Sequence, residues 1–445
     1  MNELMQEYGS NCFAVRGAIV YLTGDPFLET AETCLQYIED GLLIIDAGKI
    51  LSCGTAQKLL RSLPAAVPVQ TYPHGIILPG FIDTHIHYVQ TDMIGSYGEQ
   101  LLDWLNTYTF PEELKFSDPF HCKNVAKRFM DQLLKSGTTT AMVFCAVYPE
   151  SVNALFEEAQ KINMRLIAGK VLMDRNAPEG LLDTVQSGYA DSKRLIERWH
   201  GTGRLSYAIT PRFAPTSSPE QLEAAGQLWK EHPTTYIQSH ISENKKEVAW
   251  AASLFPERKN YLDIYHHYGL TGKQALYAHG VHLLEEEFQC CYDTGTSLAH
   301  CPTSNMFLGS GLFDVSAAKN KKRPVEVGLG TDVGAGTSFS MLVTLNEAYK
   351  TGQLRNVPLD AVKLLYLATL GGARALSLED KIGTLEAGKE ADFIVLNTHA
   401  TSLMKERMER VTSIQEALFL LTVLGTEETV EATYVAGKLV YKKQF

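Results

Sequence analysis

The feature of this sequence that most constrains its fold is an alternation of short apolar runs with amphipathic stretches between residues 75 and 333. Such alternation is typical of a parallel sheet whose strands are connected by helices. Eight strands spread over roughly 250–300 residues is the usual size of a (β/α)₈ barrel, or TIM barrel, and we predict that fold. The eight apolar runs are residues 75–83, 138–145, 165–173, 205–210, 235–239, 275–278, 297–299 and 325–330.

The two ends of the chain have a different pattern from the middle. Short β-like runs occur within residues 13–72, 391–396 and 430–442, with strong alternation in the last of them. These runs are either two unrelated edge segments or one small β-sandwich domain built from both termini, and chain ends often lie close together. We expect the second arrangement. The predicted division is residues 1–74 and 379–445 for the small β domain and 75–378 for the barrel.

Composition and charge exclude several classes of function. A chain of 445 residues with a formal net charge of −11 is a poor partner for nucleic acid or an anionic membrane. The first seven residues lack the basic and apolar segments of a secretory signal, and no apolar run approaches the ~20 residues of a membrane span. Eight scattered cysteines without a CxxC pair indicate small core residues in a reduced chain. We therefore expect a cytoplasmic protein.

Candidate metal ligands begin at the end of the first predicted strand. His85 and His87 are two residues apart in Ile82-Asp83-Thr84-His85-Ile86-His87, so their side chains face the same side of a strand. Two neutral imidazoles suit Zn²⁺ or a similar first-row ion. An isolated HxH pair is weak evidence, but active sites of (β/α)₈ barrels lie at the carboxyl ends of the strands.

Polar residues also end three later strands. His240 ends the fifth run, His279 the sixth and Asp332 the eighth. Any one of them alone could be a buried core histidine or a capping residue. Together with the first pair, they predict a metal site at the mouth of the barrel.

Glu243 follows His240 by three residues and lies on the loop beyond the fifth strand. A carboxyl group at this point can move a proton between water and a substrate. It can also be a favourable charge before the helical stretch that begins at Lys245. The two roles are compatible, and we favour the catalytic one.

Taken together, these residues resemble the amidohydrolase superfamily over nearly the whole chain. The landmarks are Pro79–His87, His240, His279 and Asp332, and residues 382–393 are similar to its C-terminal β-domain signature. Binuclear members often use a carboxylated lysine from the third or fourth strand. Here the fourth run ends in Thr210-Pro211-Arg212-Phe213, and Lys170 lies inside the third run. The resemblance therefore implies one metal ion, as in the aminohydrolase branch.

Within that branch the chain resembles the guanine deaminase family. The motifs that support this resemblance occur in the expected order, and Thr303 replaces an asparagine that is frequent in the family. They are residues 84–90, 102–112, 210–213, 238–244, 300–305 and 328–333.

The resemblance implies hydrolysis of guanine to xanthine and ammonia by a metal-activated hydroxide, as part of purine catabolism. His85, His87, His240 and Asp332 would hold one Zn²⁺, with Fe²⁺ as the alternative ion. Glu243 would deliver a proton to the ring, and Asp332 would take one from the attacking water. His279 would stabilise the hydroxide. The resemblance also implies a homodimer.

Three further residues are predicted to bind the base beside His87, His240, Glu243 and Asp332. A guanidinium only donates hydrogen bonds, so Arg212 suits the O6 acceptor of guanine and not the amino group of adenine. Gln90 can donate and accept at the ring edge, and Phe213 can stack on the ring. The alternatives are a strand-end salt bridge, a loop hydrogen bond and core packing, respectively.

Two other functions stay open at this point. One is an aminohydrolase acting on a different heterocycle, such as a triazine, a pterin or an adenosine derivative. The other is a non-catalytic barrel that serves as a scaffold. Scaffold relatives typically lose metal ligands, whereas this sequence has the complete set.

Overall fold

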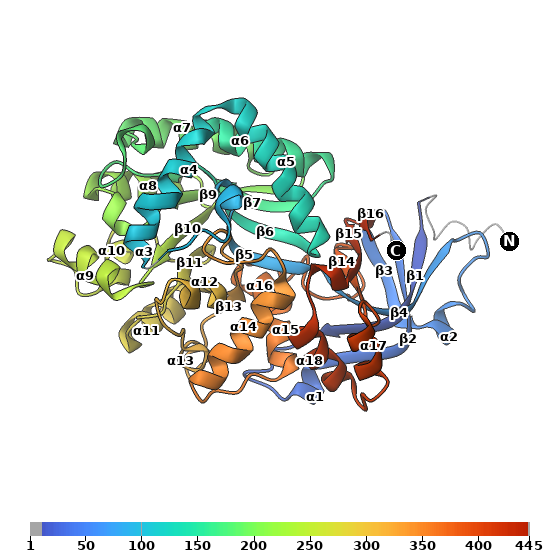
Figure 1. Ribbon diagram of the computed structural model, residues 1–445. Coiled ribbons are helices and arrows are strands. Elements are labelled where there is room, and N and C mark those ends of the chain that lie inside the picture. The colour runs from blue at the N-terminus through green and yellow to red at the C-terminus, as the bar shows by residue number, and fades with distance from the viewer. Residues whose placement is uncertain (1–10, 99, 444–445) are drawn as a thin grey trace.

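The computed structural model describes residues 11–98 and 100–443, and its largest unit is a parallel barrel (Figure 1). In this part of the chain eight strands follow one another in sequence order, and each pairs in parallel with the next. The N–H of Asp332 donates to the His85 carbonyl at 2.9 Å and so links the last strand to the first. The barrel strands are β5 (Phe81–His87), β6 (Thr138–Phe144), β7 (Arg165–Gly169), β9 (Leu205–Pro211), β10 (Tyr236–Ile241), β11 (Ala275–His279), β12 (Ser297–His300) and β13 (Val327–Leu329), and the short β8 (Val171–Leu172) pairs with β9.

Helices surround the barrel on its outside (Figure 1). Their starts follow the expected chemistry: α5 begins with Pro119, and the side chain of Asp118 accepts a hydrogen bond from the Phe120 N–H at 2.9 Å. The helices between β6 and the end of the barrel are α6 (Pro149–Lys161), α7 (Val185–Trp199), α8 (Pro219–Glu231), α9 (Lys245–Leu254), α10 (Tyr261–His267), α11 (Glu285–Thr294), α12 (Pro302–Phe307), α13 (Val315–Ala318), α14 (Met341–Leu354), α15 (Ala361–Ala368) and α16 (Leu370–Ala375), and α5 is Pro119–Lys135.

A series of short helical segments connects β5 to α5 and contributes to the mouth of the barrel. It matters for function because its residues line the same pocket as the strand-end histidines. The segments are η2 (Tyr88–Met93), α3 (Leu101–Trp104), η3 (Leu105–Thr109), α4 (Phe110–Glu113) and η4 (Leu114–Ser117).

The second unit is a sheet in which both ends of the chain meet, at the right of Figure 1. Among the described residues it has seven strands, and β14 pairs antiparallel with β4, which joins the C-terminal segment to the N-terminal one. This arrangement confirms the prediction of one small β unit built from both termini. Its strands, in sheet order, are β16 (Lys438–Lys442), β15 (Val430–Val435), β14 (Phe393–Asn397), β4 (Val69–Pro79), β1 (Phe13–Leu22), β2 (Leu35–Asp46) and β3 (Lys49–Thr55).

One predicted strand was wrong in its extent. The apolar run 75–83 is divided between two units, because residues 75–79 belong to β4 of the small sheet and the barrel strand β5 starts at Phe81. Gly80 separates them, and a Cβ there would lie 2.0 Å from Thr139 Oγ1, so only glycine fits at this corner. Both strands are buried, and for this reason hydropathy alone did not show the break. The predicted domain boundaries stay a prediction.

The C-terminal segment also contributes two helices, α17 (Ser402–Met408) and α18 (Ile414–Leu424). None of the helices in residues 11–98 and 100–443 has the length and apolar character needed to cross a membrane.

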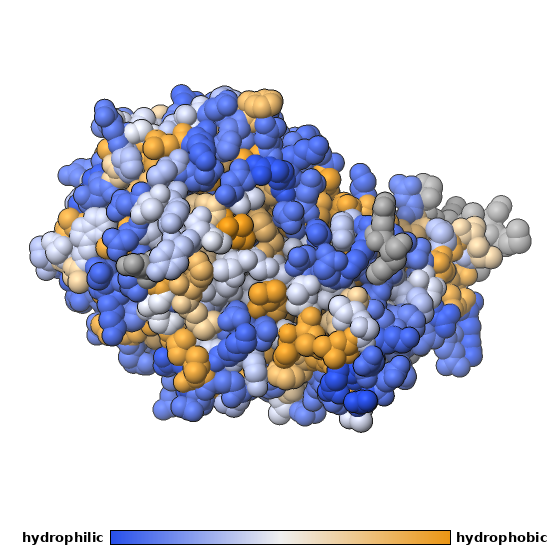
Figure 2. All heavy atoms as spheres, in the orientation of Figure 1, coloured by the Kyte–Doolittle hydropathy of each residue, from blue (hydrophilic) through white to orange (hydrophobic). Residues whose placement is uncertain are grey.

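The face drawn in Figure 2 is largely hydrophilic, with apolar patches interspersed. The first seven residues, on which the signal-peptide prediction was based, lie outside the described part of the chain.

Candidate metal centre and active site

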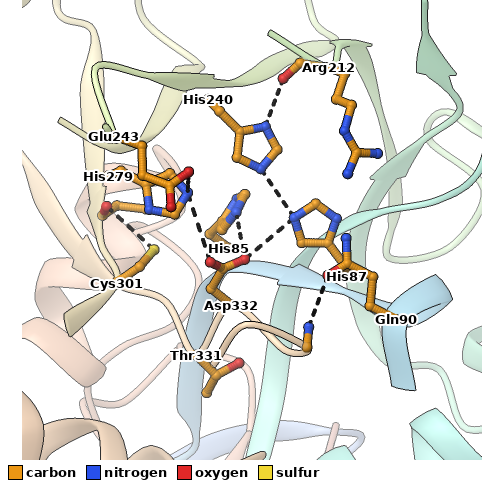
Figure 3. A network of polar contacts seen from close by, with 12 residues as sticks. His85, His87, Gln90, Arg212, His240, Glu243, His279, Cys301, Thr331 and Asp332 are labelled. Atoms are coloured by element: carbon orange, nitrogen blue, oxygen red, sulfur yellow. Dashed lines mark hydrogen bonds and ion pairs between the residues drawn. The ribbon is translucent and has the colours of Figure 1, made fainter. Parts of the chain in front are cut away.

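The predicted metal ligands meet at the carboxyl ends of three barrel strands (Figure 3). His85 and His87 are on β5, His240 is near the end of β10, and Asp332 follows β13. One ligand atom from each of these residues lies within 4.8 Å of the others. The structure therefore brings these four residues together, and their role as metal ligands stays a prediction.

The distances within this group suit a bound metal ion. His87 Nε2 and His240 Nε2 are 3.1 Å apart, and Asp332 Oδ1 is 3.2 Å from His85 Nε2. His240 Nδ1 contacts the Arg212 carbonyl at 2.7 Å, which places its hydrogen on Nδ1 and directs the Nε2 lone pair to the centre. His85 Nε2 is buried and has no hydrogen-bond partner among the residues that the structure describes. Imidazole nitrogens arranged in this way fit a first-row ion held by three histidines and a carboxylate.

Burial sets the charge state of the ligands. It lowers the pKa values of His87 and His240 well below the usual range, and neighbouring His85 lowers both further. Neutral imidazole is the form that binds metal. Burial acts to raise the pKa of Asp332, but the neighbouring His85 and His279 outweigh it and bring the pKa to about 2. The centre thus offers neutral nitrogens and one ionised carboxylate.

Unusual backbone conformations turn the strand-end side chains toward the mouth of the barrel. His279 has φ of 77° and Asp332 has φ of 51°, both in the left-handed region that non-glycine residues seldom adopt. Such conformations tend to occur at functional sites. Asp83 supports the Asp332 turn, because its Oδ1 accepts hydrogen bonds from the Thr331 N–H at 3.1 Å and the His85 N–H at 3.2 Å.

Glu243 lies beside the metal group and next to His279. Its Oε2 is 3.5 Å from His279 Nε2, and its Oε1 accepts a hydrogen bond from Ser310 Oγ at 3.3 Å. Burial raises the pKa of Glu243 to about 7. A carboxyl group of this kind can both hold and release a proton near neutral pH.

His279 occupies a position between Glu243 and the metal group. Its Nε2 is 3.8 Å from Asp332 Oδ2, and its Nδ1 contacts Asn305 Oδ1 at 2.9 Å. Since an amide oxygen only accepts, Asn305 places a hydrogen on Nδ1. Burial acts to lower the pKa of His279, but Glu243 and Asp332 raise it above the usual value.

The predicted base-binding residues line the same pocket as the metal group. The pocket that they share lies at the mouth of the barrel. Arg212 and Gln90 are drawn beside His87 in Figure 3. The lining residues are His87, Gln90, Leu101, Trp104, Leu105, Arg212, Phe213, His240, Glu243, Glu247, His279, Leu308, Asp332 and Ala335.

Sequence reasoning missed the contribution of the segment 101–113. Trp104 and its neighbours form one wall of the pocket, and the fully buried Glu113 binds Arg212 and Gln90 behind it. The motif at residues 102–112 was a sequence signal for this segment. It indicated a family resemblance, but no spacing rule linked it to the mouth of the barrel.

Lys170 has its own partner away from the proposed ligands. Its ammonium group is fully buried and binds Asp183 Oδ2 at 2.6 Å and the Val171 carbonyl at 3.3 Å. The side chain is therefore occupied in a buried ion pair.

A second group, formed by Asp92, Glu112 and His121, also has ligand atoms close together. Arg128 already binds both oxygens of Asp92 at 2.6 and 2.7 Å, and Lys115 binds Glu112 at 2.5 Å. These cations balance the carboxylates, so the group has no need of a metal ion.

A barrel with a histidine-rich metal group at its mouth, beside a buried acid, defines the class of metal-dependent hydrolases. The amidohydrolase family model matches residues 76–440, and the chain belongs to this family. It is 52% identical to guanine deaminase of Escherichia coli (strain K12), over 97% of this chain and 98% of that protein. The solved structure of the E. coli guanine deaminase superimposes with a TM-score of 0.94, covering 97% of this chain and all of that one.

A third comparison shows a relative with its ligand. The crystal structure of guanine deaminase from C. acetobutylicum has guanine bound in the active site. It has a TM-score of 0.87 and 29% sequence identity, and covers 97% of this chain and 100% of that chain.

Proposed function

We propose that this protein hydrolyses guanine to xanthine and ammonia. The observation that supports this most directly is a single pocket that joins a His₃Asp metal group and the buried Glu243 to Arg212, a donor suited to O6 of guanine. The identity of 52% to an E. coli guanine deaminase over nearly the full chain supports the same substrate.

The proposed metal ligands are His85, His87, His240 and Asp332, and the proposed ion is one Zn²⁺ per chain, with Fe²⁺ as the alternative. A bound ion of this kind supplies a water acidified toward a pKa of about 7. The ligand set of three neutral nitrogens and one carboxylate is typical of such ions.

The residues around the metal group divide the movement of protons between them. Glu243, whose pKa is raised to about 7 by burial, delivers a proton to the ring nitrogen beside C2 and so makes that carbon electrophilic. Asp332 accepts a proton from the attacking water and passes it to the leaving amine. His279 donates from Nε2 to the oxygen that attacks when its ring is protonated, a form that Glu243 and Asp332 favour by raising its pKa, while Nδ1–H donates to Asn305.

The opposite wall recognises the base. Arg212 donates to O6, Gln90 binds the edge of the purine ring, and Phe213 covers the face of that ring. The Phe213 ring also packs against Trp250, with 6.0 Å between the ring centroids. Adenine has an amino group where guanine has O6, and two donors facing each other would leave the Arg212 donors that face the base without an acceptor in a buried site. Such a mismatch is costly, which makes guanine the preferred base.

We further propose that the protein acts as a cytoplasmic homodimer in the breakdown of purine bases. Family resemblance supports the dimer and the pathway. The eight cysteines are all free thiols, which fits a reducing compartment.

The test is to follow guanine by its ultraviolet absorbance while the metal content of the same sample is measured. We expect guanine loss, with stoichiometric ammonia, that depends on the bound metal. A panel that includes adenine, a pterin and an amino-triazine serves as the comparison. Faster turnover of adenine than of guanine would contradict the proposal.

A further inference from the structure

Glu113 lies directly behind the two residues proposed to read the base. It is the last residue of α4, and its side chain is completely buried. Arg212 Nη1 donates to both of its oxygens, at 2.8 and 2.7 Å, and Gln90 Nε2 donates to Oε1 at 3.2 Å. One carboxylate therefore holds both base-reading side chains.

These bonds determine which way the Gln90 amide faces. A carboxylate only accepts hydrogen bonds, so the amide must direct its NH₂ group to Glu113. The amide oxygen then accepts from the Gly334 N–H at 3.1 Å. Gly334 is two residues from Asp332, so the same amide connects Glu113 to the loop of a proposed metal ligand.

The Arg212 guanidinium is held by α4 on two sides. Besides the bonds to Glu113, its central carbon lies 5.5 Å from the centre of the Phe110 ring, at the start of the same helix. Among the described residues, its side-chain hydrogen bonds all use Nη1. The donors on Nε and Nη2 remain for a ligand, and their direction is set by how α4 holds Nη1.

We propose that Glu113 is a positioning residue that sets the preference of this site for a purine bearing an oxygen at C6. This inference rests on the proposed function, because it assumes that Arg212 meets O6. Glu113 does not touch the base. It keeps a donor of Arg212 at the place where O6 binds, and it balances the buried guanidinium charge at the same time.

The test compares two inhibitors that lack the leaving amine. Hypoxanthine has the C6 oxygen and purine does not, so the ratio of their inhibition constants measures recognition of that oxygen together with the N1–H that accompanies it. In Glu113→Gln the ratio is expected to shift by about tenfold or more against hypoxanthine, since a hydrogen bond to a charged group is typically worth that much. Metal content should not change, because Glu113 lies outside the metal group.

The neighbouring residue offers a matched control. Glu112→Gln makes the same chemical change one position earlier in α4, where the carboxylate binds Lys115 instead of Arg212. We expect this variant to keep the wild-type inhibitor ratio. If Glu113→Gln does not fold, Glu113→Asp keeps the charge and withdraws it by one methylene, and the ratio should shift in the same direction.

The outcomes separate this inference from the proposed function. Wild-type turnover of guanine is measured first, and its absence would refute both. With an active wild type, an unchanged ratio in the Glu113 variants would overturn the inference alone. Equal loss of both inhibitors would also overturn it, because Glu113 would then have only a structural role.

Discussion

Individual side chains at the barrel mouth owe their chemical properties to burial and to their immediate neighbours. Glu243 is a carboxyl group with its pKa raised to about 7, whereas Asp332, a few ångströms away, has its pKa lowered to about 2. Two acids with separated pKa values allow one to donate a proton while the other accepts. His279 lies between them and contacts both.

Replacement of Glu243 by Gln tests the proton transfer directly. The amide keeps the shape of the side chain but cannot deliver a proton, so kcat for guanine should fall by at least about 10²-fold. Metal content should stay at the wild-type level, since Glu243 is outside the ligand group. Glu257→Gln, at an exposed position, is the control. Near wild-type activity in Glu243→Gln would disprove the proton-transfer role.

Removal of the metal tests the ligand group. Dialysis against a chelator should abolish turnover, because the four ligands are the proposed source of the acidified water. Added Zn²⁺ should restore activity, and Mg²⁺, which prefers oxygen ligands, should not. His240→Ala should bind less zinc by elemental analysis. Full activity in metal-free protein would show that the four proposed ligands do not act through a bound metal ion.

At the scale of secondary-structure elements, the strands place ligands and the segments between β5 and α5 complete the pocket. Three strands, β5, β10 and β13, end at the metal group, and their carboxyl ends meet because the barrel strands are parallel and in register. The segment from η2 to α4 supplies Gln90, Trp104 and Glu113. Its irregular, partly 3₁₀ and π-helical geometry follows no simple periodicity, and sequence patterns could not place it.

The N-terminus of α5 offers a test at this scale. Asp118→Ala removes the side chain that accepts the Phe120 N–H, and should lower the free energy of unfolding by about 1 kcal/mol. The cap lies on the outside of the barrel, so the kinetics should not change. Denaturant unfolding and a guanine assay on the same preparation provide both measurements. A clear fall in kcat for guanine would contradict the assignment of Asp118 as a helix cap without a part in catalysis.

Across the whole molecule, ion pairs join the barrel to the small sheet. Arg165 on β7 and Arg204 before β9 both bind Glu390, with Nε of Arg165 at 2.9 Å and Nη2 of Arg204 at 2.7 Å. Arg204 also binds Asp392, from the segment that enters β14. These contacts connect residues nearly two hundred positions apart or more, and only the tertiary structure brings them together.

Glu390→Gln tests this connection through its pH dependence. Burial acts to raise the pKa of Glu390, but Arg165 and Arg204 outweigh it and lower the pKa. A lowered pKa in the folded state stabilises the protein above the unfolded-state pKa of ~4.3, and that stabilisation is lost as the pH falls through the folded-state value. The variant should be less stable by about 2 kcal/mol at pH 7. The difference should shrink below pH ~4.

The measurement is chemical unfolding of the metal-loaded protein at several pH values. Glu379→Gln, an exposed position in the same segment, is the control and should not differ from wild type. If the difference between Glu390→Gln and wild type stayed constant from pH 7 to pH 3.5, the ion pairs would not be its cause.

The sequence by itself determined the barrel and grouped the candidate metal ligands at its mouth, whereas it only suggested the pairing of the chain ends, which the structure shows between β14 and β4. Periodicity predicts parallel strands, and parallel strands bring their ends to one place, so His85, His87, His240 and Asp332 could be grouped without coordinates. The grouping of these four residues follows from the order and direction of the strands, so no measured distance is needed to predict it.

The tertiary structure alone decided the division at Gly80, the pKa separation of Glu243 and Asp332, and the role of Glu113. Each depends on which atoms meet across long stretches of chain. Two buried strands in succession look like one in hydropathy, and desolvation depends on three-dimensional burial. Glu113 meets Arg212 from 99 positions away, through an irregular segment for which no sequence period predicts a neighbour.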